Sequence, residues 1–165
     1  AGVEATAILA TDFRDRLAGQ VPDALLESAE GFYDRVSVVP EAAVLREYAD
    51  AMHDPTEGGL VDGLLELAVA SGVGLDVDPD AIPVREETRR LCAAVDVDPF
   101  RTFGSGALLA AVPERSTTEA LSALDDAGVE ASVVGTVHER ETPALVLGGE
   151  TFEEPVRDDM YALWE

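Results

Sequence analysis

Lysine is absent from this chain of 165 residues: all 11 basic side chains are arginine, against 34 aspartate and glutamate residues. The formal net charge at pH 7 is −23. Nucleic acids and anionic membranes both attract proteins through basic patches. The charge balance therefore predicts neither a nucleic-acid partner nor a membrane partner.

Residues that commonly carry nucleophilic or metal chemistry are also scarce, because the chain has one cysteine, Cys92, and two histidines, His53 and His138. A lone cysteine forms no disulfide within the chain, so we expect a cytoplasmic protein in which Cys92 packs as a small apolar side chain. One cysteine and two histidines offer no zinc-ligand spacing, so no metal site is expected.

Long apolar runs and aromatic residues are few: aromatics make up 5% of the chain, although 47% is hydrophobic. Because acidic residues are dispersed among periodic apolar ones, the chain is expected to fold rather than to form a disordered acidic tail. An acid excess without lysine is typical of proteins adapted to molar salt, where charges are screened within about 3 Å. The chain starts with Ala rather than Met, so we expect it to be part of a longer protein.

Hydrophobic periodicity and end signals predict alternating helices and strands. Helices are expected over residues 3–13, 22–32, 40–50, 59–71, 85–95 and 116–127. Strands are expected over residues 37–39, 75–77, 106–113, 130–137 and 144–152, the last with a Gly-Gly turn. The predicted fold class is α/β, with one domain over residues 1–165 and a mixed sheet packed against helices.

The stretch MHDPTEGGL (52–60) places two adjacent glycines at the front of a predicted helix, where each costs about 1 kcal/mol relative to alanine. In one interpretation Asp54 is the N-cap residue, Pro55 the first helical residue and Glu57 the acid of a capping box. That interpretation explains the polar residues but leaves both glycines unexplained.

In the other interpretation, the amide hydrogens of Gly58 and Gly59 stand free ahead of Leu60. A helix N-terminus carries unpaired N–H groups and a partial positive charge, and glycine lets a ligand approach the backbone closely. Such a place binds anions, most often phosphate. His53, just before it, either orders the loop by hydrogen bonds or acts as an acid, a base or a substrate contact.

A second candidate is the stretch TFGSGALLAAV (102–112), in which Gly-Ser-Gly precedes a predicted buried strand. It offers backbone donors and the hydroxyl of Ser105, or it is simply a tight turn entering the sheet. Ser105 is not expected to act as a nucleophile, because a serine needs a base. Only His53 and His138 could serve, and His138 is expected at the surface.

These motifs resemble the carboxy-terminal domain of the AIR synthase superfamily. The resemblance starts with HDPTEGGL and the helix ending LAVASGVGLDVD, continues through IPVREETRRLC and GSGALL, and reaches the segment ending VVGTV. It covers nearly the whole chain in the family's order. Within the superfamily, the HDPT-x-GG stretch is most similar to the HypE group of hydrogenase maturation proteins.

The resemblance implies a PurM-like α/β fold and an ATP-dependent enzyme. Full-length members join an amino-terminal ATP-binding domain to this one and dimerise chiefly through the amino-terminal domain. They use ATP to activate an oxygen of an amide or carboxyl-type substrate. ATP and Mg would thus be bound mainly by the amino-terminal domain, which is the expected partner, within a homodimer. The present chain is expected to be inactive alone.

The resemblance also implies that the loop from His53 to Gly59 faces the active cleft, with His53 the candidate for catalysis. The implied phosphate- and substrate-binding residues are His53, Asp54, Thr56, Gly58, Gly59, Ser105 and Gly106. Two features depart from the HypE pattern: the chain ends DDMYALWE rather than in a cysteine, and Ser105 stands where HypE proteins carry a glutamate. A non-catalytic binding or scaffold module that retains the fold is therefore the alternative.

Overall fold

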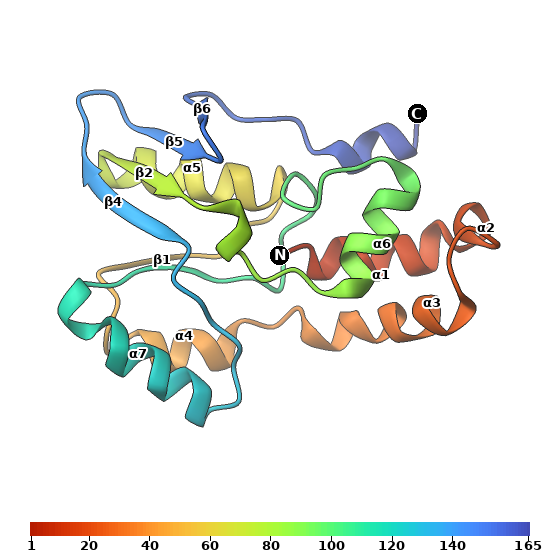
Figure 1. Ribbon diagram of the computed structural model, residues 1–165, viewed down its shortest axis with the longest axis horizontal. Coiled ribbons are helices and arrows are strands. Elements are labelled where there is room, and N and C mark those ends of the chain that lie inside the picture. Colours follow the sequence, from red (N-terminus) through yellow and green to blue (C-terminus); the bar gives the residue numbers. More distant parts are fainter.

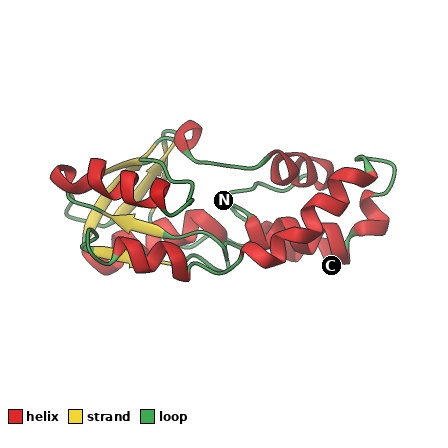
Figure 2. Cartoon of the chain, turned by 90° about the horizontal axis from the view of Figure 1, so that it is seen from below, coloured by secondary structure: helices red, strands yellow, loops and turns green.

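The computed structural model describes residues 1–165 as an elongated molecule, with only helices at one end and all the strands at the other (Figure 2). The helical end contains α1 (Val3–Asp12), α2 (Arg14–Leu17), α3 (Asp23–Glu30), the short 3-10 helix η1 (Gly31–Arg35) and α6 (Glu86–Val95). The C-terminal 3-10 helix η3 (Asp159–Leu163) packs on the same end.

Small side chains let the helices of this end approach one another closely. α1 buries Ala5, Leu9 and Ala10 completely, and they pack in one cluster with Cys92 of α6 and Met160 of η3. Burial raises the pKa of the Cys92 thiol to about 12, so the thiol stays protonated and unreactive at neutral pH. The prediction that Cys92 packs as an apolar residue is confirmed.

At the other end, four strands form a mixed sheet in the order β4-β2-β5-β6 (Figure 1). The strands are β2 (Val73–Val77), β4 (Gly135–Glu139), β5 (Ala144–Leu147) and β6 (Glu150–Phe152). β2 pairs with β4 antiparallel and with β5 parallel, and β5 and β6 form a hairpin through Gly148 and Gly149. Helix α5 (Gly59–Ser71) packs on the sheet through a cluster that contains Leu64, Ala68 and Leu145.

A second, two-stranded sheet lies at the same end of the molecule as the four-stranded sheet (Figure 2). β1 (Ala51–His53) pairs antiparallel with β3 (Leu109–Ala111), which places His53 opposite Leu109. Helices α4 (Val39–Leu45) and α7 (Glu114–Asp126) pack together beside this sheet, and the short 3-10 helix η2 (Pro79–Ala81) follows β2. None of the helices combines the length and the hydropathy needed to cross a membrane.

The predicted fold class is confirmed: the chain is a mixed α/β domain with sheets packed on helices. Helix α5 has the predicted bounds, α6 starts one residue later than predicted, and the Gly-Gly turn is present. Cys92 and the other predicted inward residue of α6, Leu91, are buried.

Other predicted bounds are wrong. Residues 37–39 form no strand, because α4 begins at Val39 with Pro40 in its first turn, and α4 ends at Leu45 rather than at residue 50. Residues 130–134 belong to no strand, so β4 begins only at Gly135, and β3 is confined to residues 109–111. Helix α7 starts at Glu114, directly after Pro113, rather than at residue 116.

Candidate functional site

The loop between β1 and α5 needs both of its glycines. The helix begins at Gly59, and Gly58 is its N-cap residue, with φ angles of +66° and +73° respectively. This left-handed region is accessible to glycine at little cost and disfavours residues with a β-carbon. Asp54 is exposed and makes no capping hydrogen bond, so the predicted capping box is wrong.

Gly59 also lies directly against the second predicted motif. A β-carbon there would lie 2.3 Å from the carbonyl oxygen of Thr102 and 2.8 Å from that of Phe100. Further along the same two segments, the amide of Gly104 donates to the carbonyl of Thr56 at 2.8 Å. The structure therefore brings the His53–Gly59 loop and the Thr102–Gly106 turn side by side.

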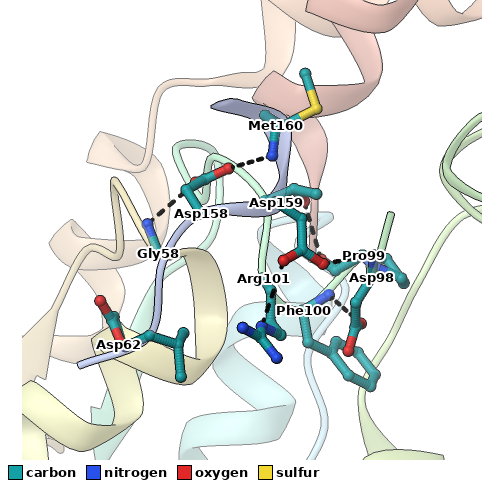
Figure 3. A network of polar contacts seen from close by, with 11 residues as sticks. Gly58, Asp62, Asp98, Pro99, Phe100, Arg101, Asp158, Asp159 and Met160 are labelled. Carbon is teal, nitrogen blue, oxygen red and sulfur yellow. Dashed lines mark hydrogen bonds and ion pairs between the residues drawn. The ribbon is translucent and has the colours of Figure 1, made fainter. Parts of the chain in front are cut away.

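The amide hydrogens of the two glycines are not free. Gly58 N donates to Oδ2 of Asp158 at 3.0 Å (Figure 3). Gly59 N donates to the carbonyl of Thr56 at 3.2 Å. Both glycines are buried. The prediction of unpaired amides ahead of Leu60 is therefore wrong in this structure: a carboxylate of the same chain occupies the anion position at the start of α5.

Three aspartates hold the C-terminal segment, residues 155–165, across this position (Figure 3). Asp62 accepts from Val156 N at 2.7 Å, and Asp158 accepts from Met160 N at 2.9 Å as well as from Gly58 N. Sequence reasoning missed these contacts, because the Gly58–Asp158 bond joins residues 100 positions apart.

The third aspartate, Asp159, accepts from Asp98 N at 3.1 Å, and one of its oxygens lies 3.6 Å from Nε of Arg101. Burial raises the pKa of Asp158 and of Asp62 above the usual value for aspartate, although the N–H donors of Gly58, Met160 and Val156 oppose this shift. The start of α5 thus gathers three aspartate side chains, and Arg101 is the cation that pairs with one of them, Asp159.

His53 has a partner that the sequence did not predict. Its Nε2 atom lies 2.6 Å from Oε2 of Glu66, which projects from the exposed side of α5. No local pattern in the sequence places β1 next to Glu66. His53 and Asp54 make no contact with each other, as expected of neighbours in an extended segment.

Ser105 and Gly106 lie at the edge of the site and face the helical end. The carbonyl of Ser105 accepts from Glu4 N at 3.2 Å, and a β-carbon on Gly106 would lie 2.7 Å from Cβ of Val3. Gly106 has a φ angle of +91°, so the turn at this position requires glycine. No histidine bonds the Ser105 hydroxyl, because His53 pairs with Glu66.

Two cavities flank the outer side of α5. The larger, of about 390 Å³, is lined by Asp62, Leu65, Glu66, Val69, Ala70, Glu153 and Pro155. The smaller, of about 220 Å³, lies between β1 and α5 and is lined by Ala51, Met52, His53, Glu66, Leu67, Ala70 and Ser71. Of the predicted site residues, only His53 lines either cavity, and no group of three His, Cys, Asp or Glu side chains is arranged to hold a metal ion.

The fold and the two adjoining motifs define a class of protein. Residues 2–148 match the family described as AIR synthase related protein, C-terminal domain, and the chain belongs to that family. Among curated relatives, it is 39% identical over 104 residues to the carbamoyl dehydratase HypE of Azotobacter vinelandii, a match that covers 62% of this chain and 28% of that protein.

Solved structures agree with this family. HypE of E. coli superposes with a TM-score of 0.60 and 28% identity, covering 72% of this chain and 40% of the other. The thiamine-monophosphate kinase of Stenotrophomonas maltophilia superposes with a TM-score of 0.69 over 90% of this chain and 48% of the other, but at 21% identity it indicates a shared fold only. The matches thus span less than half the length of these relatives.

Proposed function

We propose that this chain is the carboxy-terminal half of an ATP-dependent enzyme of the HypE and AIR synthase-related type. In this proposal its own amino-terminal ATP-binding domain completes the active cleft, and the chain is inactive alone. The longer protein would be a cytoplasmic homodimer. The observation that carries the proposal is the contact between the His53–Gly59 loop and the Thr102–Gly106 turn in a chain of this family.

The electrostatics of the site support the proposal that the amino-terminal domain, rather than this chain, binds most of the phosphate charge. Phosphoryl transfer needs cations around the phosphates, usually Mg²⁺ together with lysine or arginine. This chain brings three aspartates and one arginine, Arg101, to the start of α5. A HypE protein 26% identical to this chain, with a TM-score of 0.57, has been solved in complex with ATP. We therefore propose that ATP and Mg are bound mainly by the amino-terminal domain.

On this proposal the His53–Gly59 loop supplies the wall of the cleft that meets the phosphates or the substrate. Asp54 and Thr56 are exposed and accessible to a ligand, and His53 is the candidate acid or base. Gly58 can bind a ligand's anionic group only after the carboxylate of Asp158 has left its amide. Ser105 and Gly106 form the adjoining edge of the cleft.

A non-catalytic binding or scaffold module is the second candidate. It is favoured by the closed state of the α5 N-terminus, where Asp158 already fills the anion position, and by Ser105 in place of the glutamate of HypE proteins. In that case the fold would be retained while the cleft no longer turns over a substrate.

Calorimetric titration with ATP and Mg²⁺ tests the shared site. We expect weak or no binding by this chain alone and robust binding by the longer protein that includes the amino-terminal domain. Asp158→Ala, which frees the Gly58 amide, serves as a variant of the chain whose anion position is open. Nanomolar ATP binding by the chain alone would contradict the proposal that the site is shared.

A further inference from the structure

The pair formed by His53 and Glu66 joins two elements of the fold, strand β1 and helix α5 (Figure 1). β1 fixes the backbone of His53 by pairing it with Leu109 of β3. Helix α5 fixes Glu66, which follows His53 by 13 positions, and the distance between Nε2 and Oε2 is 2.6 Å. Two regular elements thus hold the side chains in hydrogen-bonding contact.

The pair lies where the two cavities meet. Glu66 lines both of them, whereas His53 lines only the smaller one, of about 220 Å³. The side chain of His53 is 32% exposed, so its ring is accessible from that cavity. A ligand in the smaller cavity would therefore contact the ring of His53 and, beside it, the carboxylate of Glu66.

The contact with Glu66 determines which ring nitrogen of His53 is available. A carboxylate oxygen only accepts hydrogen bonds, so Nε2 carries a proton and donates it to Glu66. In the neutral ring Nδ1 is then the unprotonated atom, and it makes no hydrogen bond within the chain. Glu66 thus sets both the orientation and the tautomer of the ring.

We propose that Glu66 is the positioning residue of His53, and that Nδ1 of His53 takes a proton from an O–H or N–H group of a ligand in the smaller cavity. The inference rests on the proposed function, in which His53 faces the ligand. The O–H or N–H bond breaks, its electron pair stays on the ligand atom, and the proton bonds to Nδ1. The carboxylate of Glu66 stabilises the positive ring that results.

Stability alone does not explain why Glu66 occupies this position. Asp62 lies four residues earlier on the same helix, and like charges at this spacing destabilise a helix. The Glu66 side chain is 60% exposed, and exposed ion pairs contribute little to stability. The contact therefore contributes more to the geometry of His53 than to the stability of α5.

NMR of the chain labelled with ¹⁵N-histidine tests the positioning directly, at a pH of about 8.5, above the usual titration range of histidine. We expect His53 to be wholly in the Nε2–H form. In Glu66→Ala a second, Nδ1–H form appears, whereas Glu66→Gln, which keeps an acceptor oxygen, retains the Nε2–H form. Glu153→Ala is the matched control, because Glu153 lines the larger cavity but does not contact His53. A wild-type His53 that populates both forms would overturn the proposal.

Turnover by the longer protein provides the second readout. We expect Glu66→Ala to lower kcat by about tenfold to a hundredfold with little change in KM, within what a positioned acid–base group contributes. Glu153→Ala should leave both constants unchanged. An unchanged kcat in Glu66→Ala, together with lost turnover in His53→Ala, would overturn the role of Glu66 alone. If His53→Ala also leaves turnover unchanged while the NMR result holds, the proposed role of His53 is overturned instead.

Discussion

At Gly59 a left-handed backbone conformation and close packing occur together, and the two contributions can be separated by mutation. Gly59 and Gly72 have nearly equal φ angles, +66° and +69°, but a β-carbon would meet the Thr102 backbone at Gly59 and nothing within 4 Å at Gly72. The left-handed conformation costs an L-residue roughly 1–2 kcal/mol. The difference between the two sites therefore measures the clash with residues 100–102.

We expect Gly72→Ala to lower the free energy of unfolding by about 1–2 kcal/mol and Gly59→Ala by about 4 kcal/mol, in the range diagnostic of a backbone clash. Urea denaturation followed by circular dichroism gives both values. Equal losses in the two variants would mean that the Thr102 backbone moves away readily, and that the close contact between the two motifs is not required.

For single residues, the sequence shows which positions are unusual but not which contacts explain them. The double glycine was recognised as costly, and its explanation needs Thr102 and Asp158, which lie more than 40 residues away. Glu66 is an exposed residue of α5, and its pairing with His53 depends on how β1 packs against that helix. Such contacts are tertiary, and no local pattern encodes them.

Among the elements, the C-terminal segment depends most on a few polar contacts. Asp158 is 2% exposed and satisfies the amides of Gly58 and Met160. Trp164, the only tryptophan, packs edge-on against Phe13 of α1 with ring centroids 4.9 Å apart, so its fluorescence reports on docking of this segment. Loss of the Asp158 carboxylate leaves two amides without acceptors, one of them at the start of α5.

We expect Asp158→Ala to lower the free energy of unfolding by about 2 kcal/mol, the typical cost of leaving buried polar groups unpaired. The Trp164 signal should change at lower urea concentration than in the wild type. Glu154→Ala is the matched control, because Glu154 is an exposed carboxylate directly before this segment. An unchanged midpoint for the Trp164 signal in Asp158→Ala would contradict this role of Asp158.

Prediction of the elements succeeded where a periodic pattern was long and clearly terminated. Helix α5 has the predicted bounds because 13 positions with a periodic apolar pattern lie between Gly58 and Gly72, which both have left-handed conformations. Strand β1 has only three residues, too few for an alternating pattern, and it was missed. The Ser37–Val39 stretch has strand-like residues, but the following proline favours the start of a helix instead.

For the whole molecule, net charge is the dominant feature. Its effect on stability can be tested by changing the salt concentration. The ion pairs are largely exposed, so each contributes about 0–1 kcal/mol, whereas 34 acidic residues repel one another against 11 basic ones. Screening shortens from about 10 Å at 0.1 M to 3 Å at 1 M salt. Net repulsion should therefore weaken more than the ion pairs do.

We expect the melting temperature to rise between 0.1 M and molar KCl at pH 7. KCl is preferred to sulfate, which strengthens apolar burial whatever the charge. The same comparison near pH 4.1, the isoelectric point calculated from the sequence, is the control, since the effect should shrink there. Equal melting temperatures at low and high salt at pH 7 would contradict adaptation to high salt.

The fold class and the family could be predicted from the sequence. The alternation of helices and strands, and the order of the motifs, can both be read along the chain. The division into a helical end and a stranded end could not. Neither could the return of the C-terminal segment to the start of α5, which depends on contacts between residues about 100 positions apart.

ATP hydrolysis by the longer protein, compared between His53→Ala and His138→Ala, tests the proposed function most directly. His138 lies on edge strand β4, away from the His53–Gly59 loop, and so controls for the loss of a histidine. If the chain supplies part of an active cleft, His53→Ala loses most of the activity and His138→Ala retains it. Full activity in His53→Ala would contradict the proposal and favour a scaffold that has kept the fold without the chemistry.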